Sequence, residues 1–479
     1  MTEACDGKRN LRRRLGVLDG AAVVISNVVG TGIFLTPPLI ASRMSSATSF
    51  LGLWILGGGL ALIGALSYAE LGAMRPRAGG EYVYIREAFG PLAGFLSGWT
   101  SLVAGFSGAV AAAAVGFAIY LDRFIPGVGS TETFLEVSLG MGEAGLRLTP
   151  RALTALLLVG FFSLVHARGL GPGRMAQQIL AWLNVTTILG LVVLGFLTEP
   201  AVPVETVGSA AIGTAGGPVG DRSLGSALVA LVLVMFTYSG WNAGAYLTEE
   251  FRDPGTRLPR ALLLGTVVVI ALYLALNLLY VDTLGLMGLA ATEAAGDQLA
   301  HLLWGERGAF LITPLILLAL ASSVSAMVFT GPRVYYAMAR DGCLPKAFAR
   351  TGEARVPAFS IGAQAAWSAL LILTGGFEAL LTYTGFAVVL FAALGVGSLF
   401  VLRRTKPRAD RPFRLWGHPV LPGLFLLASA GMVIQSLLRA PAPSLLGILV
   451  IFLGIPVFMW LRRRDGGEGR RPSKDSHQE

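Results

Sequence analysis

Long apolar stretches recur along the whole chain and are separated by short polar segments. A helix needs about 20 consecutive apolar residues to cross the hydrocarbon core of a bilayer. The clearest such stretch, Pro91–Leu121, contains no charged residue. The pattern predicts twelve membrane-spanning helices, over Leu15–Ala41, Phe50–Met74, Pro91–Leu121, Ala152–Val165, Met175–Leu197, Leu224–Thr248, Ala261–Val281, Ala309–Ala339, Pro357–Thr374, Ala379–Val401, Pro419–Leu438 and Ser444–Leu461.

The composition agrees with an all-α integral membrane protein. Of the 479 residues, 54% are apolar and only 14% are charged, whereas a soluble domain carries about a quarter charged residues. The same numbers exclude intrinsic disorder. The first apolar stretch follows three arginines, as in a signal peptide, but no small-residue cleavage site follows it and further spans do.

The basic residues predict the orientation in the membrane. With these spans, 29 Lys and Arg residues fall on one side and seven on the other, and Arg333 lies inside a span. Because positive residues stay in the cytoplasm, we expect a multi-pass protein of the plasma membrane, the inner membrane of a bacterium, with both termini cytoplasmic. This charge belongs to membrane topology and contact with lipid, so we expect no nucleic-acid partner.

Two of the predicted spans are interrupted by glycine and polar residues. In the first span Gly30 and Gly32 stand one residue apart, and in the sixth span Gly240 and Gly244 follow a Thr-Tyr-Ser segment. Glycines are costly within a helix, and unwound backbone is tolerated in a membrane only where it lines a cavity. Glycines that permit close helix packing are the alternative, but breaks at corresponding places in two halves favour a transporter with inverted repeats.

The two breaks predict a receptor for an amino acid. The half-helix beginning near Ile33 presents free amides and a partial positive charge, which suit a carboxylate. The half-helix ending near Tyr238 presents free carbonyls, which suit an ammonium group. Asn27 contacts the substrate or caps the turn, and Phe236 and Trp241 form an aromatic gate or pack. The predicted substrate-binding residues are Asn27, Val28, Gly30, Thr31, Gly32, Phe236, Thr237, Tyr238, Ser239, Gly240, Trp241 and Asn242.

Four ordered motifs resemble the amino acid–polyamine–organocation superfamily. Gly30–Phe34 resembles the glycine-rich motif of its first helix, and Ala69–Tyr84 resembles the segment between its second and third helices. Tyr238–Arg260 is similar to the sixth-helix region of its L-type branch, and Arg333–Gly342 resembles the end of its eighth helix. The similarity runs from about residue 15 to residue 401.

This resemblance implies an amino acid permease of the LeuT-type fold that works by alternating access. It implies ten core helices in two inverted repeats, over residues 15–198 and 224–403, joined by an outer loop over 199–223. Two peripheral helices would occupy 419–461, between a basic cytoplasmic N-terminus, 1–14, and a cytoplasmic tail, 462–479.

Three departures from the family pattern refine the expectation. L-type members with a heavy subunit use a cysteine in the outer loop after the third helix, but residues 122–151 contain none, so no disulfide-linked heavy subunit is expected. Permeases for cationic substrates carry an acid just after the sixth-helix break, where this chain has Asn242. We therefore expect neutral L-amino acids. Asn184 stands where many members place a fifth-helix lysine.

The mode of coupling remains open at this point. Ala319, Ser322 and Ser323 resemble the pattern that contacts sodium in related carriers, and with Asn184 they form a candidate cation or coupling site. Alternatively, the two serines bond back to their own helix. Sodium-independent exchange or facilitated uptake is the default expectation. A sodium- or proton-coupled symporter and a cationic amino acid or polyamine permease are the alternatives.

The remaining polar residues indicate no catalysis. Glu70, Glu81, Glu249 and Glu250 lie at span ends or in loops on the basic side, where pairing with arginine is favoured over a role in gating. No cluster of His with Asp or of Cys with His falls in a predicted span, so an intramembrane enzyme is a remote alternative. We expect no metal and no cofactor. A channel would require a repeating polar pore lining instead of two isolated breaks.

Overall fold

The computed structural model describes residues 15–141, 144–169, 173–199, 223–292, 294–351, 356–374, 377–439 and 441–468. The predicted N-terminal segment 1–14, nearly all of the predicted outer loop 199–223 and residues 469–479 of the predicted tail lie outside this described part. The side chain of Thr31 lies outside it as well.

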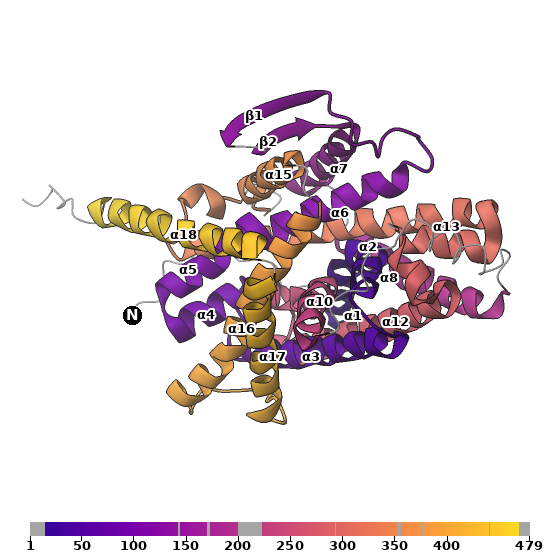
Figure 1. The fold of residues 1–479 in the computed structure, drawn as a ribbon. Coiled ribbons are helices and arrows are strands. Elements are labelled where there is room, and N and C mark those ends of the chain that lie inside the picture. Colours follow the sequence, from indigo (N-terminus) through magenta and orange to yellow (C-terminus); the bar gives the residue numbers. More distant parts are fainter. Residues whose placement is uncertain are drawn as a thin grey trace, which may run out of the picture.

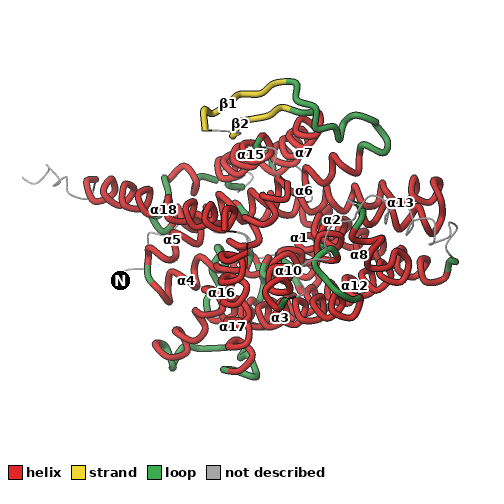
Figure 2. The backbone as a smooth tube through the Cα atoms, viewed as in Figure 1, coloured by secondary structure: helices red, strands yellow, loops and turns green. Residues whose placement is uncertain are grey.

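The described chain is almost entirely helical and contains one β-hairpin (Figure 2). The elements before residue 200 are α1 (Val17–Val28), α2 (Thr31–Ala41), α3 (Ala47–Met74), α4 (Glu81–Phe89), α5 (Pro91–Thr100), the π-helix η1 (Ser101–Gly105), α6 (Phe106–Leu121), β1 (Leu135–Met141), β2 (Ala144–Leu148), α7 (Pro150–Ala167) and α8 (Gly173–Leu197). The two strands pair antiparallel.

In the second half of the described chain all the regular elements are helices. Its elements are α10 (Leu224–Thr237), α11 (Ala243–Tyr246), the 3-10 helix η2 (Thr248–Glu250), α12 (Pro254–Ala290), α13 (Ala295–Thr330), α14 (Pro332–Arg340), the 3-10 helix η3 (Lys346–Ala349), α15 (Ala358–Leu373), α16 (Phe377–Thr405), α17 (Val420–Arg439) and α18 (Pro441–Glu468).

Helices of membrane-spanning length occupy most of the predicted spans. Among the described residues, nine helical segments are long and apolar enough to cross a bilayer, and ten if α1 and α2 form one bent span. The shorter apolar helices α10 and α15 coincide with the sixth and ninth predicted spans. Each predicted range thus contains an apolar helix, while the count of twelve crossings stays a prediction.

The two interrupted segments lie at the centre of the helical bundle (Figure 1). In that view α1 and α10 have α3 and α12 below them and α6 and α13 above them. The contacts agree, since α1 packs on α12, α8 and α13, while α10 packs on α16, α17 and α2. Helices α7 and α15 pack side by side beneath the β-hairpin. The breaks are therefore shielded from the lipid by surrounding helices.

Candidate functional site

The first predicted break is present between α1 and α2. Helix α1 ends at Val28, α2 begins at Thr31, and the two axes differ by 45°. The freed carbonyl of Val28 accepts a hydrogen bond of 2.8 Å from the hydroxyl of Tyr273 on α12. A side chain at Gly30 would place its Cβ 2.4 Å from the Ser323 hydroxyl oxygen. The first break is therefore packed closely against α13.

The second predicted break contacts the first directly. Helix α10 ends at Thr237, and only the single turn of α11 and the short η2 continue it. Gly240 adopts a φ of +108°, and a Cβ there would lie 2.8 Å from the carbonyl carbon of Asn27. Gly32 faces Thr237 equally closely, with 2.7 Å from its Cβ position to the Thr237 Cα. Segments more than 200 residues apart in the sequence thus form one site.

A cavity of about 70 Å³ opens beside these breaks. Its lining residues come from α1, α4, η1, α6, α10–α11, α13 and α16, and they are Asn27, Glu81, Gly105, Phe106, Ala109, Ser239, Gly240, Trp241, Asn242, Ala243, Tyr246, Met327, Val388 and Ala392. Five of the predicted substrate-binding residues therefore line it. Six other predicted residues lie at or next to the breaks and do not line this cavity: Val28, Gly30, Gly32, Phe236, Thr237 and Tyr238.

Two aromatic residues at the second break have separate surroundings. The Tyr238 ring packs on Trp54 and Tyr273, at centroid distances of 5.9 and 5.2 Å, and its hydroxyl donates to the Trp54 carbonyl. Trp241 packs on Tyr68 at 4.9 Å and also borders the cavity. Tyr238 is accordingly a packing residue, whereas Trp241 is placed to contact a ligand.

Asn27 and Asn242 supply amide groups to the cavity. The Asn27 amide donates to the carbonyl of Val23 within its own helix, at 2.8 Å, and to the hydroxyl of Thr330 on α13, at 3.3 Å. Asn27 thus lines the cavity while its amide is bonded to its own helix and to α13. The Asn242 amide donates to the hydroxyl of Tyr246 at 2.9 Å.

An acid that was not among the predicted substrate-binding residues also lines the cavity. Glu81 is 7% exposed, and its carboxylate accepts a hydrogen bond of 2.9 Å from Tyr68. Arginine pairing was predicted for Glu81, but it forms no ion pair with a described residue. Burial raises the pKa of this carboxyl, which lies in α4 outside the long apolar helices, against the effect of its hydrogen bonds.

The sequence contained a signal for this placement. Gly79 and Gly80, which precede Glu81, adopt φ values of +113° and +52°, a conformation that favours glycine. A Cβ at Gly80 would lie 2.4 Å from the ring of Tyr246. Gly79 and Gly80 turn the chain back against the segment after the second break. The prediction of Glu81 as an acid at a span end or in a loop did not take this turn into account.

The candidate cation site has unpaired polar groups. The hydroxyls of Ser322 and Ser323 and the amide nitrogen of Asn184 are buried without a hydrogen-bond partner in the described part of the chain. The serines are therefore not bonded back to helix carbonyls, which was the predicted alternative. Ala319 is buried on the same helix. Buried hydroxyls without partners are costly, and oxygen atoms of this kind suit a hard cation.

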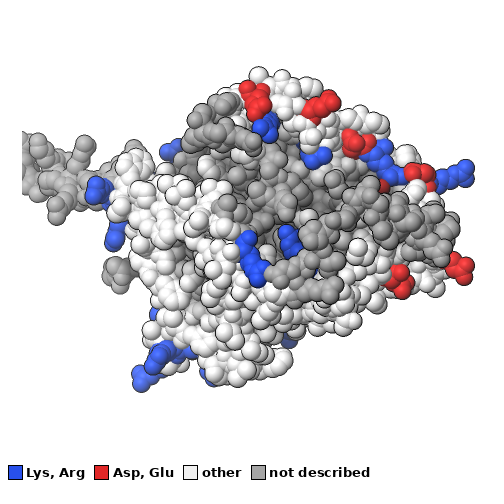
Figure 3. Space-filling model, viewed as in Figure 1, with Lys and Arg blue, Asp and Glu red and all other residues white. Residues whose placement is uncertain are grey.

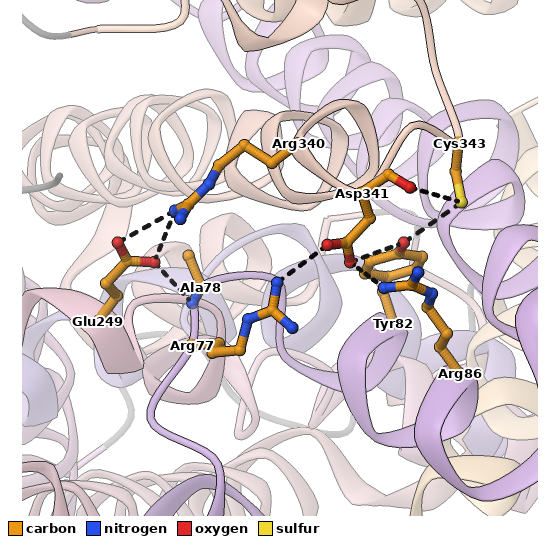
Figure 4. A network of polar contacts seen from close by, with 8 residues as sticks. All are labelled: Arg77, Ala78, Tyr82, Arg86, Glu249, Arg340, Asp341 and Cys343. Atoms are coloured by element: carbon orange, nitrogen blue, oxygen red, sulfur yellow. Dashed lines mark hydrogen bonds and ion pairs between the residues drawn. The ribbon is translucent and has the colours of Figure 1, made fainter. Parts of the chain in front are cut away.

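A network of ion pairs lies beside the turn that precedes α4 (Figure 4). Asp341, after α14, pairs with Arg77 at 2.9 Å and also with Arg86, and it accepts a hydrogen bond of 3.1 Å from Tyr82. Arg340 pairs with Glu249 of η2 at 3.1 Å. The network joins the turn before α4 to the ends of α14 and the sixth span.

The other three of these acids pair with arginine as predicted. Glu249 pairs with Arg340, and Glu250 lies 3.1 Å from Arg333, which also covers the ring of Phe329. Arg333 therefore forms a buried ion pair instead of extending toward the bilayer surface. Glu70 binds Arg403. Glu81 alone among the four lies in the cavity.

Comparison with known proteins decides the family. A family model described as amino acid permease matches residues 15–461. The chain belongs to the amino acid permease family. This permease is similar to large neutral amino acids transporter small subunit 2 of Homo sapiens, with 30% identity over 94% of this chain and 80% of that protein.

Two further relatives place the permease in the L-type branch, as its motifs indicated. It is 25% identical to b(0,+)-type amino acid transporter 1 of Homo sapiens, over 94% of this chain and 88% of the relative. It is 27% identical to Asc-type amino acid transporter 1 of Mus musculus, over 94% and 81%. The protein is thus a multi-pass membrane transporter of amino acids and not an enzyme.

Proposed function

We propose that this permease carries neutral L-amino acids across the plasma membrane by alternating access. Its twelve spans would form a LeuT-type fold, with inverted repeats over 15–198 and 224–403 and peripheral helices over 419–461. One observation carries the proposal: the breaks of the first and sixth spans meet beside one cavity. Such interrupted helices mark the substrate site of transporters with inverted repeats.

The helix ends supply the chemistry for a zwitterion. The N-terminal amides of α2 around Gly30 and Gly32 suit the substrate carboxylate, and the carbonyls at the end of α10 suit its ammonium group. The side chain then extends toward Trp241 and Asn242. Asn242 is uncharged, and one relative is named a large neutral amino acids transporter, which supports a neutral substrate.

We further propose that no disulfide-linked heavy subunit is required. One relative is named a small subunit, which implies a larger partner for that protein. In this chain residues 122–151 contain no cysteine. Cys343 is free and buried beside Tyr82.

The function is tested by counterflow in proteoliposomes. Vesicles preloaded with unlabelled alanine are expected to take up labelled alanine without a sodium or proton gradient, because exchange needs only alternating access. Failure of every neutral amino acid to exchange would reject the proposal. The unpartnered serine hydroxyls favour a second candidate, sodium-coupled uptake. Sodium-driven accumulation that is lost in Ser323→Ala but kept in Ser67→Ala, whose hydroxyl bonds the Ile63 carbonyl, would establish it.

The proposed topology is tested by single cysteines in a background without Cys5 and Cys343. A cysteine at Glu136, in β1, is expected to react with an impermeant reagent added to intact cells. A cysteine at Gly467, near the end of α18, is expected to react only after the cells are opened. The reason is the positive-inside rule, and Figure 3 shows Lys and Arg at the left and lower left of one face and Asp and Glu at its top and right. Labelling of both positions from outside would overturn the orientation.

A further inference from the structure

Glu81 is held at the cavity by a fixed turn. The amide of Gly79 donates to the carbonyl of Tyr246 at 3.3 Å, and Gly80 leaves no room for a Cβ beside the Tyr246 ring. Glu81 follows directly as the first residue of α4. The carboxyl position is therefore set by the segment that continues the second break.

Among the described residues this carboxyl has no counter-charge. The other acids at this end, Glu70, Glu249, Glu250 and Asp341, each contact an arginine. Within the described structure the carboxylate of Glu81 accepts a hydrogen bond of 2.9 Å from Tyr68 on α3, and the hydroxyls of Tyr246 on α11 and Ser101 on η1 lie beside it. A buried carboxylate without a cation is costly, so stability of the fold does not explain the acid.

The surroundings of Glu81 provide an ordered set of donors. Its titratable neighbours in the described structure are the phenols Tyr68, Tyr246 and, on its own helix, Tyr84. Phenols ionise near pH 10, about three units above neutral, so they act as neutral donors. The Tyr246 hydroxyl accepts from the Asn242 amide, which leaves the Tyr246 proton available to the neighbouring Glu81. A carboxylate has about four lone-pair positions, so the bond from Tyr68 leaves room for a ligand in the cavity that Glu81 lines.

We propose that Glu81 selects the charge class of the substrate, because the cavity takes up one positive charge at this carboxyl. That charge is either a proton, accompanying a neutral amino acid, or the ammonium end of a short cationic side chain. The inference rests on the proposed amino acid site. The cavity volume of about 70 Å³ favours a short side chain.

The two substrate classes then have opposite pH dependence. A neutral amino acid binds the protonated form of Glu81, so its affinity falls as pH rises through the pKa of Glu81. A cationic one binds the ionised form, so its affinity rises over the same range. Each changes by up to about tenfold per pH unit, since affinity scales with the competent fraction. Because burial raises the pKa of Glu81, the change falls nearer to neutral pH than for an exposed carboxyl.

The test is equilibrium binding of alanine and of 2,4-diaminobutyrate to the purified full-length permease. Titration runs over roughly pH 5.5 to 7.5, where an alkyl amine with a pKa near 10.4 stays charged. Opposite slopes are expected for the two ligands. Glu81→Gln should weaken 2,4-diaminobutyrate binding by at least about tenfold and remove the pH dependence of alanine binding, because the neutral amide cannot ionise. Parallel or flat slopes in the wild type would overturn the inference.

Two further variants distinguish an effect on the charge of Glu81 from a failure of Glu81→Gln to fold. Tyr68→Phe removes a hydrogen bond to the ionised carboxyl, which raises its pKa, so the midpoints of both pH curves should move to higher pH. Glu87→Gln, on the same helix, alters the pair with Arg75 and should keep the opposite slopes. Midpoints unmoved in Tyr68→Phe would overturn the inference. If neither ligand binds the wild type, the proposed function itself fails, whereas alanine binding without pH dependence rejects only the role of Glu81.

Discussion

Replacement of Gly240 by alanine is expected to reduce transport about 100-fold, because a displacement of about 1 Å in a binding site can cost this much. The φ of Gly240 is +108°, and the added Cβ would lie 2.8 Å from the backbone carbonyl carbon of Asn27. Backbone cannot rotate away as a side chain can, so the two breaks must separate. The measurement is the initial rate of labelled alanine uptake in proteoliposomes, normalised to reconstituted protein.

Gly59→Ala is the matched control for this prediction. Gly59 lies exposed within α3, and a Cβ there meets no atom within 4 Å. Alanine is also favoured over glycine in a helix interior, so uptake should be retained. Equal activity of Gly240→Ala and Gly59→Ala would show that transport does not depend on contact between the two breaks.

The helices and their interruptions were predictable because both are local properties of the chain. An apolar run of sufficient length predicts a span, and the glycines at Gly30, Gly32 and Gly240 predict where it unwinds. The structure has α1 ending at Val28 and α10 ending at Thr237, within the predicted segments. The length of helix after the second break was not predictable, and α11 is much shorter than the expected half-span.

The cavity was predicted less completely because its lining depends on distant contacts. Tyr238 is the first residue of the second break, but its ring packs against Trp54 on α3 and Tyr273 on α12. In the sequence Glu81 lies between predicted spans with arginines nearby, which favours an ion pair. The turn at Gly79 and Gly80 places it at the cavity instead. Hydrophobic periodicity shows neither the geometry of a turn nor which helix packs over a given hydroxyl. The sequence therefore did not predict that the Ser323 hydroxyl has no partner among the described residues.

Replacement of Arg403 by alanine is expected to destabilise the permease by about 3 kcal/mol, as removal of one partner of a buried ion pair does. Glu70 is fully buried on α3. Its oxygens accept bonds from Arg403 at 2.9 and 2.5 Å and from the Leu415 amide at 2.7 Å. Arg411 keeps a positive charge near Glu70, but at 3.5 Å it lies farther from the carboxylate than Arg403 does. The measurement is the apparent melting temperature of the purified protein in detergent.

Two comparisons separate this effect from a general loss of charge. Arg147→Ala breaks an exposed pair with Glu136 in the hairpin, and exposed pairs contribute about 0–1 kcal/mol, so its melting temperature should stay near that of the wild type. The double variant Glu70→Gln with Arg403→Met removes both charges and should recover much of the loss, since the cost arises from a carboxylate left without its cation. If Arg403→Ala melts like Arg147→Ala, then Arg411 and the Leu415 amide alone stabilise Glu70. In that case the attachment of α3 to α16 does not depend on the ion pair.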